Sequence, residues 1–237
     1  MTTDTLQTTT ELDQARHHYR NNVIPAEKLK VMDSATAELI ASGIKASALK
    51  EGERARDFIL MDAHGGPVRL HSLLSVGPVV ISFYRGGWCP YCNIELRGLQ
   101  RVLPEIKALG ASLVAISPQL PDNSLSTEEK NNLTFPVLSD VGNTVARRFG
   151  IVFKLPEDLL ETYTEFNHGL ADMNGREGAS GLPMPATYVL DQSGTIRLAF
   201  VDEDYTKRLD PDTIVMTLRN LRRSQAAAPA QGDSYAK

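Results

Sequence analysis

Residues 79–92 are Val79-Val80-Ile81-Ser82-Phe83-Tyr84-Arg85-Gly86-Gly87-Trp88-Cys89-Pro90-Tyr91-Cys92. The first six residues are mostly β-branched or aromatic, and the run is too short for an ordinary helix, so it predicts a buried strand. Apolar residues then recur at helical spacing from Leu96 to Ile106. The pattern predicts a strand, a glycine turn and a helix, with both cysteines at the N-terminus of that helix.

The same alternation of strands and helices continues on both sides of this unit. Short apolar runs on either side of the turn His64-Gly65-Gly66-Pro67 predict an early hairpin. Further strands are expected at residues 113–116, 137–138, 187–190 and 196–201, helices at 126–132, 143–149, 156–166 and 210–221, and a flexible loop at 174–181. This order predicts an α/β sandwich with a thioredoxin-like fold.

The chain divides into three parts by composition. Apolar residues such as Leu29, Met32 and Ile40 recur at three- and four-residue spacing, which predicts an N-terminal helical extension over residues 1–50. We expect this extension to pack on the main domain, residues 51–223, or on a second copy of the chain. Residues 224–237 are rich in alanine, glutamine, glycine and serine, which predicts a disordered tail.

The charge balance and the N-terminus exclude several partners. With 25 basic and 29 acidic residues and no basic run, the chain offers nothing to attract nucleic acid or an anionic membrane. The first residues, Met1-Thr2-Thr3-Asp4-Thr5, lack the basic and apolar regions of a secretory signal, and no apolar run reaches the ~18 residues of a membrane span. We therefore expect a cytoplasmic protein that acts on a small molecule or on another protein.

Cys89 and Cys92 are the two cysteines of the chain. At positions i and i+3 of a first helical turn they share one face and can form a disulfide with little backbone movement. The unpaired amides of a helix N-terminus lower a cysteine pKa, so the pair predicts redox chemistry. Structural zinc takes four ligands and the five histidines are scattered, so we expect no metal and no cofactor. Two inert buried cysteines are the plain alternative.

A longer motif resembles a known family. It consists of Phe83-Tyr84-Arg85-Gly86-Gly87-Trp88-Cys89-Pro90-Tyr91-Cys92-Asn93-Ile94-Glu95-Leu96, with Ser117-Pro118 and Phe135-Pro136-Val137-Leu138-Ser139-Asp140 further on. These segments resemble the peroxiredoxin superfamily (alkyl hydroperoxide reductase and thiol-specific antioxidant), in particular its branch with a CxxC motif. The resemblance covers about residues 52–221.

The resemblance implies a thiol peroxidase that reduces hydrogen peroxide or organic hydroperoxides through the CxxC pair. The family pattern Pro-x-x-x-Thr/Ser-x-x-Cys places Arg85 at the proline, Cys89 at the threonine and Cys92 at the peroxidatic cysteine, and Glu95 matches a common glutamate. The resemblance also implies thioredoxin, glutaredoxin or glutathione as the reductant of the resulting disulfide.

Two departures from the family pattern keep other functions open. The family polarises its peroxide with a threonine or serine hydroxyl and a distant arginine, but Cys89 replaces the hydroxyl and Pro185 stands where the arginine is expected. Pro185-Ala186-Thr187 instead resembles the cis-proline segment that positions a partner's backbone in thioredoxin-like reductases. A thiol-disulfide oxidoreductase, related to thioredoxin or glutaredoxin, and a non-enzymatic redox sensor therefore remain as alternatives, and a homodimer is a further expectation.

The roles within the motif follow from two competing arguments. Helix-terminus physics favours Cys89 as the attacking sulfur, whereas the longer family match assigns peroxide attack to Cys92 and resolution to Cys89, and we adopt the second as the prediction. Trp88 is expected to shield the thiols or simply to pack, and Arg85 to supply the missing positive charge or to be salt-bridged at the surface. The histidines show no spacing that indicates a site.

Overall fold

The computed structural model describes residues 3–227 and contains a seven-stranded sheet in the order β2-β1-β5-β4-β3-β8-β9. Its strands are β1 (Ile59–Asp62), β2 (Pro67–Arg69), β3 (Val79–Phe83), β4 (Ser112–Ser117), β5 (Val137–Ser139), β8 (Ala186–Leu190) and β9 (Ile196–Val201). β3, β4 and β5 are parallel, whereas β8 and β1 run antiparallel to their neighbours. The predicted α/β class and the early hairpin are confirmed.

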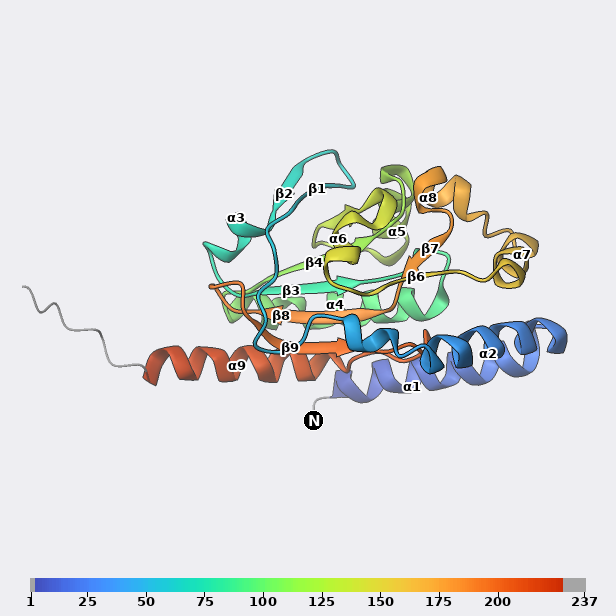
Figure 1. Ribbon diagram of the computed structural model, residues 1–237. Helices are drawn as coiled ribbons and strands as arrows, with labels where there is room; N and C mark the ends of the chain where they lie inside the picture. Colours follow the sequence, from blue (N-terminus) through green and yellow to red (C-terminus); the bar gives the residue numbers. More distant parts are fainter. Residues whose placement is uncertain (1–2, 228–237) are drawn as a thin grey trace, which may run out of the picture.

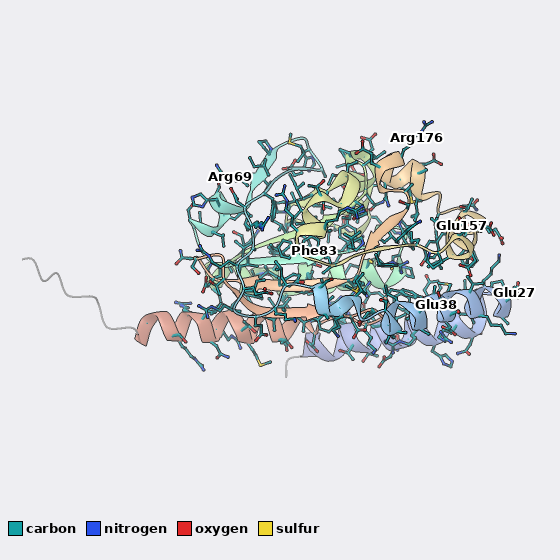
Figure 2. All side chains as sticks on the ribbon, viewed as in Figure 1. Glu27, Glu38, Arg69, Phe83, Glu157 and Arg176 are labelled. Carbon is teal, nitrogen blue, oxygen red and sulfur yellow. The ribbon has the colours of Figure 1, made fainter. Side chains whose placement is uncertain are left out.

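Helices cover both faces of the sheet, so every residue of β3 is buried. Alternate side chains point to opposite faces, and Val80 lies on one face while Phe83 lies on the other. The first face carries α4 (Pro90–Ala108), α9 (Pro211–Ala227) and α1 (Thr3–His18), and the second carries α3 (Leu70–Leu74) and α6 (Thr144–Arg148) (Figure 1). In Figure 2, Phe83 lies inside the molecule, whereas Arg69, Glu157 and Arg176 project from its edge.

The N-terminal extension is two helices rather than one. α1 is followed by a π-helical turn (Tyr19–Val23), by α2 (Ala26–Ala41) and by a 3-10 turn (Ile44–Ser47). Pro25 interrupts the helix because it has no backbone N–H to donate. α1 packs against α4, and α2 packs against α7 (Glu157–Glu165), so the extension is docked on the main domain.

Three predicted element boundaries are wrong. α5 (Pro121–Asn131) begins at Pro121, a favoured first helical residue, and Ser126 lies inside it, where its hydroxyl donates to the Asp122 carbonyl. The expected loop at 174–181 is largely α8 (Leu170–Gly178), which is followed by β7 (Gly181–Pro183), the partner of β6 (Val152–Lys154). α9 continues four residues past Arg223, and the rest of the predicted tail, residues 228–237, lies outside the described residues.

No helix within residues 3–227 is both long and apolar enough to cross a membrane.

Candidate active site

Both cysteines lie at the start of α4, as predicted. Cys89 is the N-cap, Pro90 is the first helical residue, and Cys92 lies one turn into the helix. Both are free thiols and both are buried, with 1 % of Cys89 and none of Cys92 exposed. The helix therefore presents two adjacent sulfurs to the interior rather than to the surface.

The two glycines before the motif are required by packing. Gly86 has a φ of +151°, and a Cβ there would lie 2.3 Å from the Trp88 indole nitrogen. A Cβ on Gly87 would lie 2.2 Å from the Thr127 hydroxyl. The turn is thus closed around the Trp88 and Thr127 side chains.

An arginine does reach the thiols, from a segment that the sequence analysis passed over. Arg208 lies between β9 and α9, and its Nη2 donates a hydrogen bond to Cys92 Sγ at 3.2 Å. Its Nε donates to Glu95 Oε2 at 2.5 Å, and both side chains of this ion pair are almost fully buried. The expectation that the site lacks a distant arginine is therefore wrong, because the arginine follows the last strand instead of preceding β8.

Arg85 lies beside the thiols without a carboxylate partner. Its guanidinium carbon is 4.9 Å from the Trp88 ring, 5.4 Å from the Tyr163 ring and 4.5 Å from the Tyr205 ring. It donates a hydrogen bond to the Tyr163 hydroxyl, while its buried Nε has no partner. No ion pair to Arg85 forms within the described part of the chain, so the aromatic cage holds a cation that is 2 % exposed.

These charges and the burial of the site shift the pKa values of the two thiols in opposite directions. Burial would raise the pKa of Cys89, but a hydrogen bond from Cys92 and the charges of Arg85 and Arg208 together lower it to about 5. Burial and the neighbouring Cys89 raise the pKa of Cys92 well above its usual value. Burial also raises the pKa of Glu95 to about 7, although Arg208 opposes this. The site therefore favours one thiolate, on Cys89, with Cys92 as a thiol.

A cavity of about 400 Å³ opens in front of Cys89. Its inner wall includes Arg85, Trp88 and Tyr163, and His168 stacks near Trp88 with ring centroids 5.2 Å apart. Burial lowers the pKa of His168, so this ring is neutral near pH 7. Cys92 does not line the cavity. Of the two cysteines, Cys89 is therefore the one that a molecule in the cavity can reach.

The predicted site residues divide into two groups. Cys89, Cys92, Trp88 and Arg85 come together, as their closeness in the sequence requires. Pro185 is buried behind Arg85, on a small cleft beside α2 rather than on the cavity. All peptide bonds within residues 3–227 are trans, so the expected resemblance of Pro185 to a cis-proline segment is wrong.

Several residues of the site were missed by sequence reasoning. They are Arg208, Tyr163, Tyr205, His168 and the wall residues of the N-terminal extension. All of them come from segments far from the motif and carry no local pattern. One signal existed: a glutamate at a buried position of α4, Glu95, requires a cationic partner somewhere in the chain.

A dithiol at the start of the helix that follows an inner strand of such a sheet, here β3, is typical of a thiol-based oxidoreductase. Residues 52–199 match the model of the AhpC/TSA family, and the chain belongs to that family. The recognised resemblance, the thioredoxin-like peroxiredoxin fold and the enzyme class are thereby confirmed: the chain is a peroxiredoxin-like thiol peroxidase.

Individual relatives agree with this assignment. A putative peroxiredoxin of Mycobacterium tuberculosis (strain H37Rv) is 29% identical over 177 residues, which cover 73% of this chain and 99% of that protein. Chloroplastic peroxiredoxin Q of Sedum lineare is 31% identical over 167 residues, which cover 70% of this chain and 76% of that protein. The crystal structure of peroxidoxin BcpB from Mycobacterium tuberculosis superposes with a TM-score of 0.58 at 27% identity, covering 73% of this chain and 98% of BcpB.

Proposed function

We propose that Cys89 is the sulfur that attacks the peroxide and that Cys92 is the resolving thiol. The observation that carries this proposal is that Cys89 lines the cavity and Cys92 does not. The low pKa of Cys89, about 5, supports the same order, because the thiolate is the nucleophile. This order reverses the one taken from the family pattern, which treats Cys89 as the equivalent of a threonine.

The reaction then balances within the pair. The Cys89 thiolate attacks the peroxide oxygen that bears the hydrogen, the O–O bond breaks, and Cys89 becomes a sulfenic acid. The other oxygen takes one proton from solvent and leaves as water or an alcohol. The Cys92 thiol attacks the Cys89 sulfenic acid, an S–S bond forms, and the hydroxyl leaves as water with the Cys92 proton. The two sulfurs lose two electrons, which the peroxide gains. Arg208 lies 3.2 Å from Cys92 Sγ and stabilises the negative charge that develops there during the second step.

An external thiol must reduce the disulfide, and thioredoxin, glutaredoxin or glutathione fits this role. The incoming thiol reaches Cys89 first, because Cys89 lines the cavity and Cys92 does not. A cytoplasmic location belongs to the proposal, because a dithiol that must return to its reduced form suits a reducing compartment. A homodimer, and the absence of metal and cofactor, are retained from the sequence as predictions.

The order of attack is tested by treating Cys92→Ser and Cys89→Ser separately with peroxide in the presence of dimedone, which traps sulfenic acid. We expect Cys92→Ser to form the adduct rapidly at Cys89 and Cys89→Ser to remain unmodified. A fast adduct on Cys92 in the Cys89→Ser variant would restore the family order.

The activity itself is tested by stopped-flow mixing with peroxide, run beside an insulin disulfide reduction assay. We expect fast peroxide consumption by the wild type, one Cys89–Cys92 disulfide per equivalent, and monomeric chains on a non-reducing gel. Fast insulin reduction with slow peroxide consumption would favour the thiol-disulfide oxidoreductase instead. Slow rates in both assays, with a partner that binds one redox form, would favour the sensor.

A further inference from the structure

The outer wall of the cavity comes from outside the part of the chain that matches the family model. Tyr19, Val23, Ile24 and Met32 line the cavity opposite Cys89, whereas the family match begins at residue 52. The N-terminal extension therefore adds a wall to the thiol site that the matched domain does not supply.

This wall is firmly docked. Met32 is buried among Leu159 and Tyr163, which joins α2 to the inner wall of the cavity. Lys28 Nζ forms an ion pair with Glu165 at 2.6 Å, and both terminal nitrogens of Arg20 bind the Asp33 carboxylate at 2.8 Å. The cavity is thus preformed, a property that favours binding because little ordering is required.

The cavity is far larger than hydrogen peroxide requires. One water takes about 30 Å³ of liquid volume, so a molecule of two oxygens occupies a small part of a cavity of about 400 Å³. Aromatic and aliphatic side chains form most of its lining, and no carboxylate or lysine is among the residues that line it. Such a lining suits the apolar body of an organic molecule and disfavours a cation.

We propose that residues 19–32, which lie outside the family match, set the peroxide preference of this chain: they form a wall that favours a hydroperoxide with an apolar body about the size of a substituted benzene ring over hydrogen peroxide. The inference rests on the proposed attack by Cys89, because the peroxide group must point to the sulfur that faces the cavity. Val23 and Met32 then contact the apolar body, not the reacting oxygens.

The test enlarges one side chain at the outer edge of the cavity so that less volume remains for a substrate. Val23 lines the cavity and is 50 % exposed, so Val23→Phe adds volume without disturbing the core. We expect Val23→Phe to lower kcat/KM for cumene hydroperoxide about tenfold more than it lowers kcat/KM for hydrogen peroxide. Val76→Phe is the matched control, because Val76 is 77 % exposed beyond the end of α3 and lines none of the described cavities. Equal losses for both peroxides in Val23→Phe, or a wild type that prefers hydrogen peroxide, would overturn the inference.

A binding measurement separates this inference from the proposed reaction. Trp88 is the single tryptophan of the chain and lines the cavity, so its fluorescence reports an occupant directly. We expect 2-phenyl-2-propanol, the alcohol product of cumene hydroperoxide, to change this fluorescence saturably and to bind Val23→Phe about tenfold more weakly. Binding without peroxide turnover would contradict the proposed function alone. Turnover of both peroxides without saturable binding would contradict the inference alone.

Discussion

Above about pH 7, where Glu95 is ionised, the charges around the two sulfurs balance in the reduced protein. Arg85 and Arg208 are buried cations, and Glu95, which binds Arg208, is the buried carboxylate that accompanies them. The remaining positive charge on Arg85 faces the Cys89 thiolate, and each raises the ionisation of the other. A buried charge without a partner is strongly unfavourable, so this balance holds Cys89 ionised while the site is reduced.

Replacing Arg85, the cation within the aromatic cage, should therefore raise the fraction of Cys89 that is protonated at a given pH. We expect Arg85→Met to raise the pKa of Cys89 from about 5 by at least about one unit, because the larger of the two arginine attractions on its thiolate is lost. The rate of peroxide attack near pH 6 should fall in parallel. The thiolate absorbance at 240 nm, titrated against pH, measures the shift. Arg85→Lys keeps a cation and should move the pKa less; an unchanged titration in Arg85→Met would refute the role of Arg85.

The sequence could predict only those site residues that lie close together in the chain. Arg85, Trp88, Cys89 and Cys92 lie within eight consecutive residues, so a strand-turn-helix pattern is enough to bring them together. Arg208 lies 116 positions from Cys92, and its place depends on how the last strand and α9 pack. A long-range contact of this kind leaves no periodic or motif signal in a single sequence.

Among the elements, the strands of the seven-stranded sheet and the helices α6, α7 and α9 were predictable, whereas α8 and the strand pair β6 and β7 were not. β3 is buried on both faces and apolar at every position except Ser82, and such a run predicts a strand almost independently of its context. α8 contains two glycines and looks like a loop, but its Met173 carbonyl accepts hydrogen bonds from the Leu120 amide and the Asn123 side chain. Tertiary contacts of this kind override weak local helix propensity.

The docking of the N-terminal extension depends on one glycine. Gly150, after α6, has a φ of +70°, and a Cβ there would lie 2.0 Å from the Ser47 carbonyl oxygen. The Ser47 hydroxyl donates to the Gly150 carbonyl at 2.7 Å, so the two backbones are in direct contact. The segment that leads from α2 into the main domain is therefore held by close backbone approach in addition to the apolar packing of Ile44, Ala48 and Leu49.

We expect Gly150→Ala to lower the free energy of unfolding by more than about 2 kcal/mol, because backbone strain adds to a clash with main chain. Gly110→Ala is the control: Gly110 has a φ of +77° but nothing within 4 Å of the added Cβ, so about 1 kcal/mol is expected. Urea unfolding of both variants measures the difference. Equal losses would show that the contact with Ser47 adds nothing to docking.

For the molecule as a whole, redox state and stability are linked through Cys89. Its pKa is lower in the folded protein, about 5, than in the unfolded chain, about 9. The thiolate therefore contributes stability that is present in full above pH 9 and is lost as the pH falls through about 5. Oxidation removes this thiolate and leaves Arg85 without its counter-charge, while the new disulfide closes a loop of only four residues, worth about 2 kcal/mol in the chain-entropy account.

The stabilisation by the Cys89 thiolate exceeds that by the disulfide at high pH and falls below it at low pH. At pH 8 the thiolate contributes about 4 kcal/mol, more than the disulfide, so the reduced protein should resist urea better than the oxidised protein. At pH 5 the thiolate contributes less than about 1 kcal/mol, so the oxidised protein should be the more stable form. Urea midpoints of protein kept reduced with a phosphine and of protein oxidised with diamide, compared at both pH values, test this reversal. A disulfide form that is more stable at pH 8 as well would mean that Cys89 is not held as a thiolate, and the charge balance around Arg85 would then need another anion.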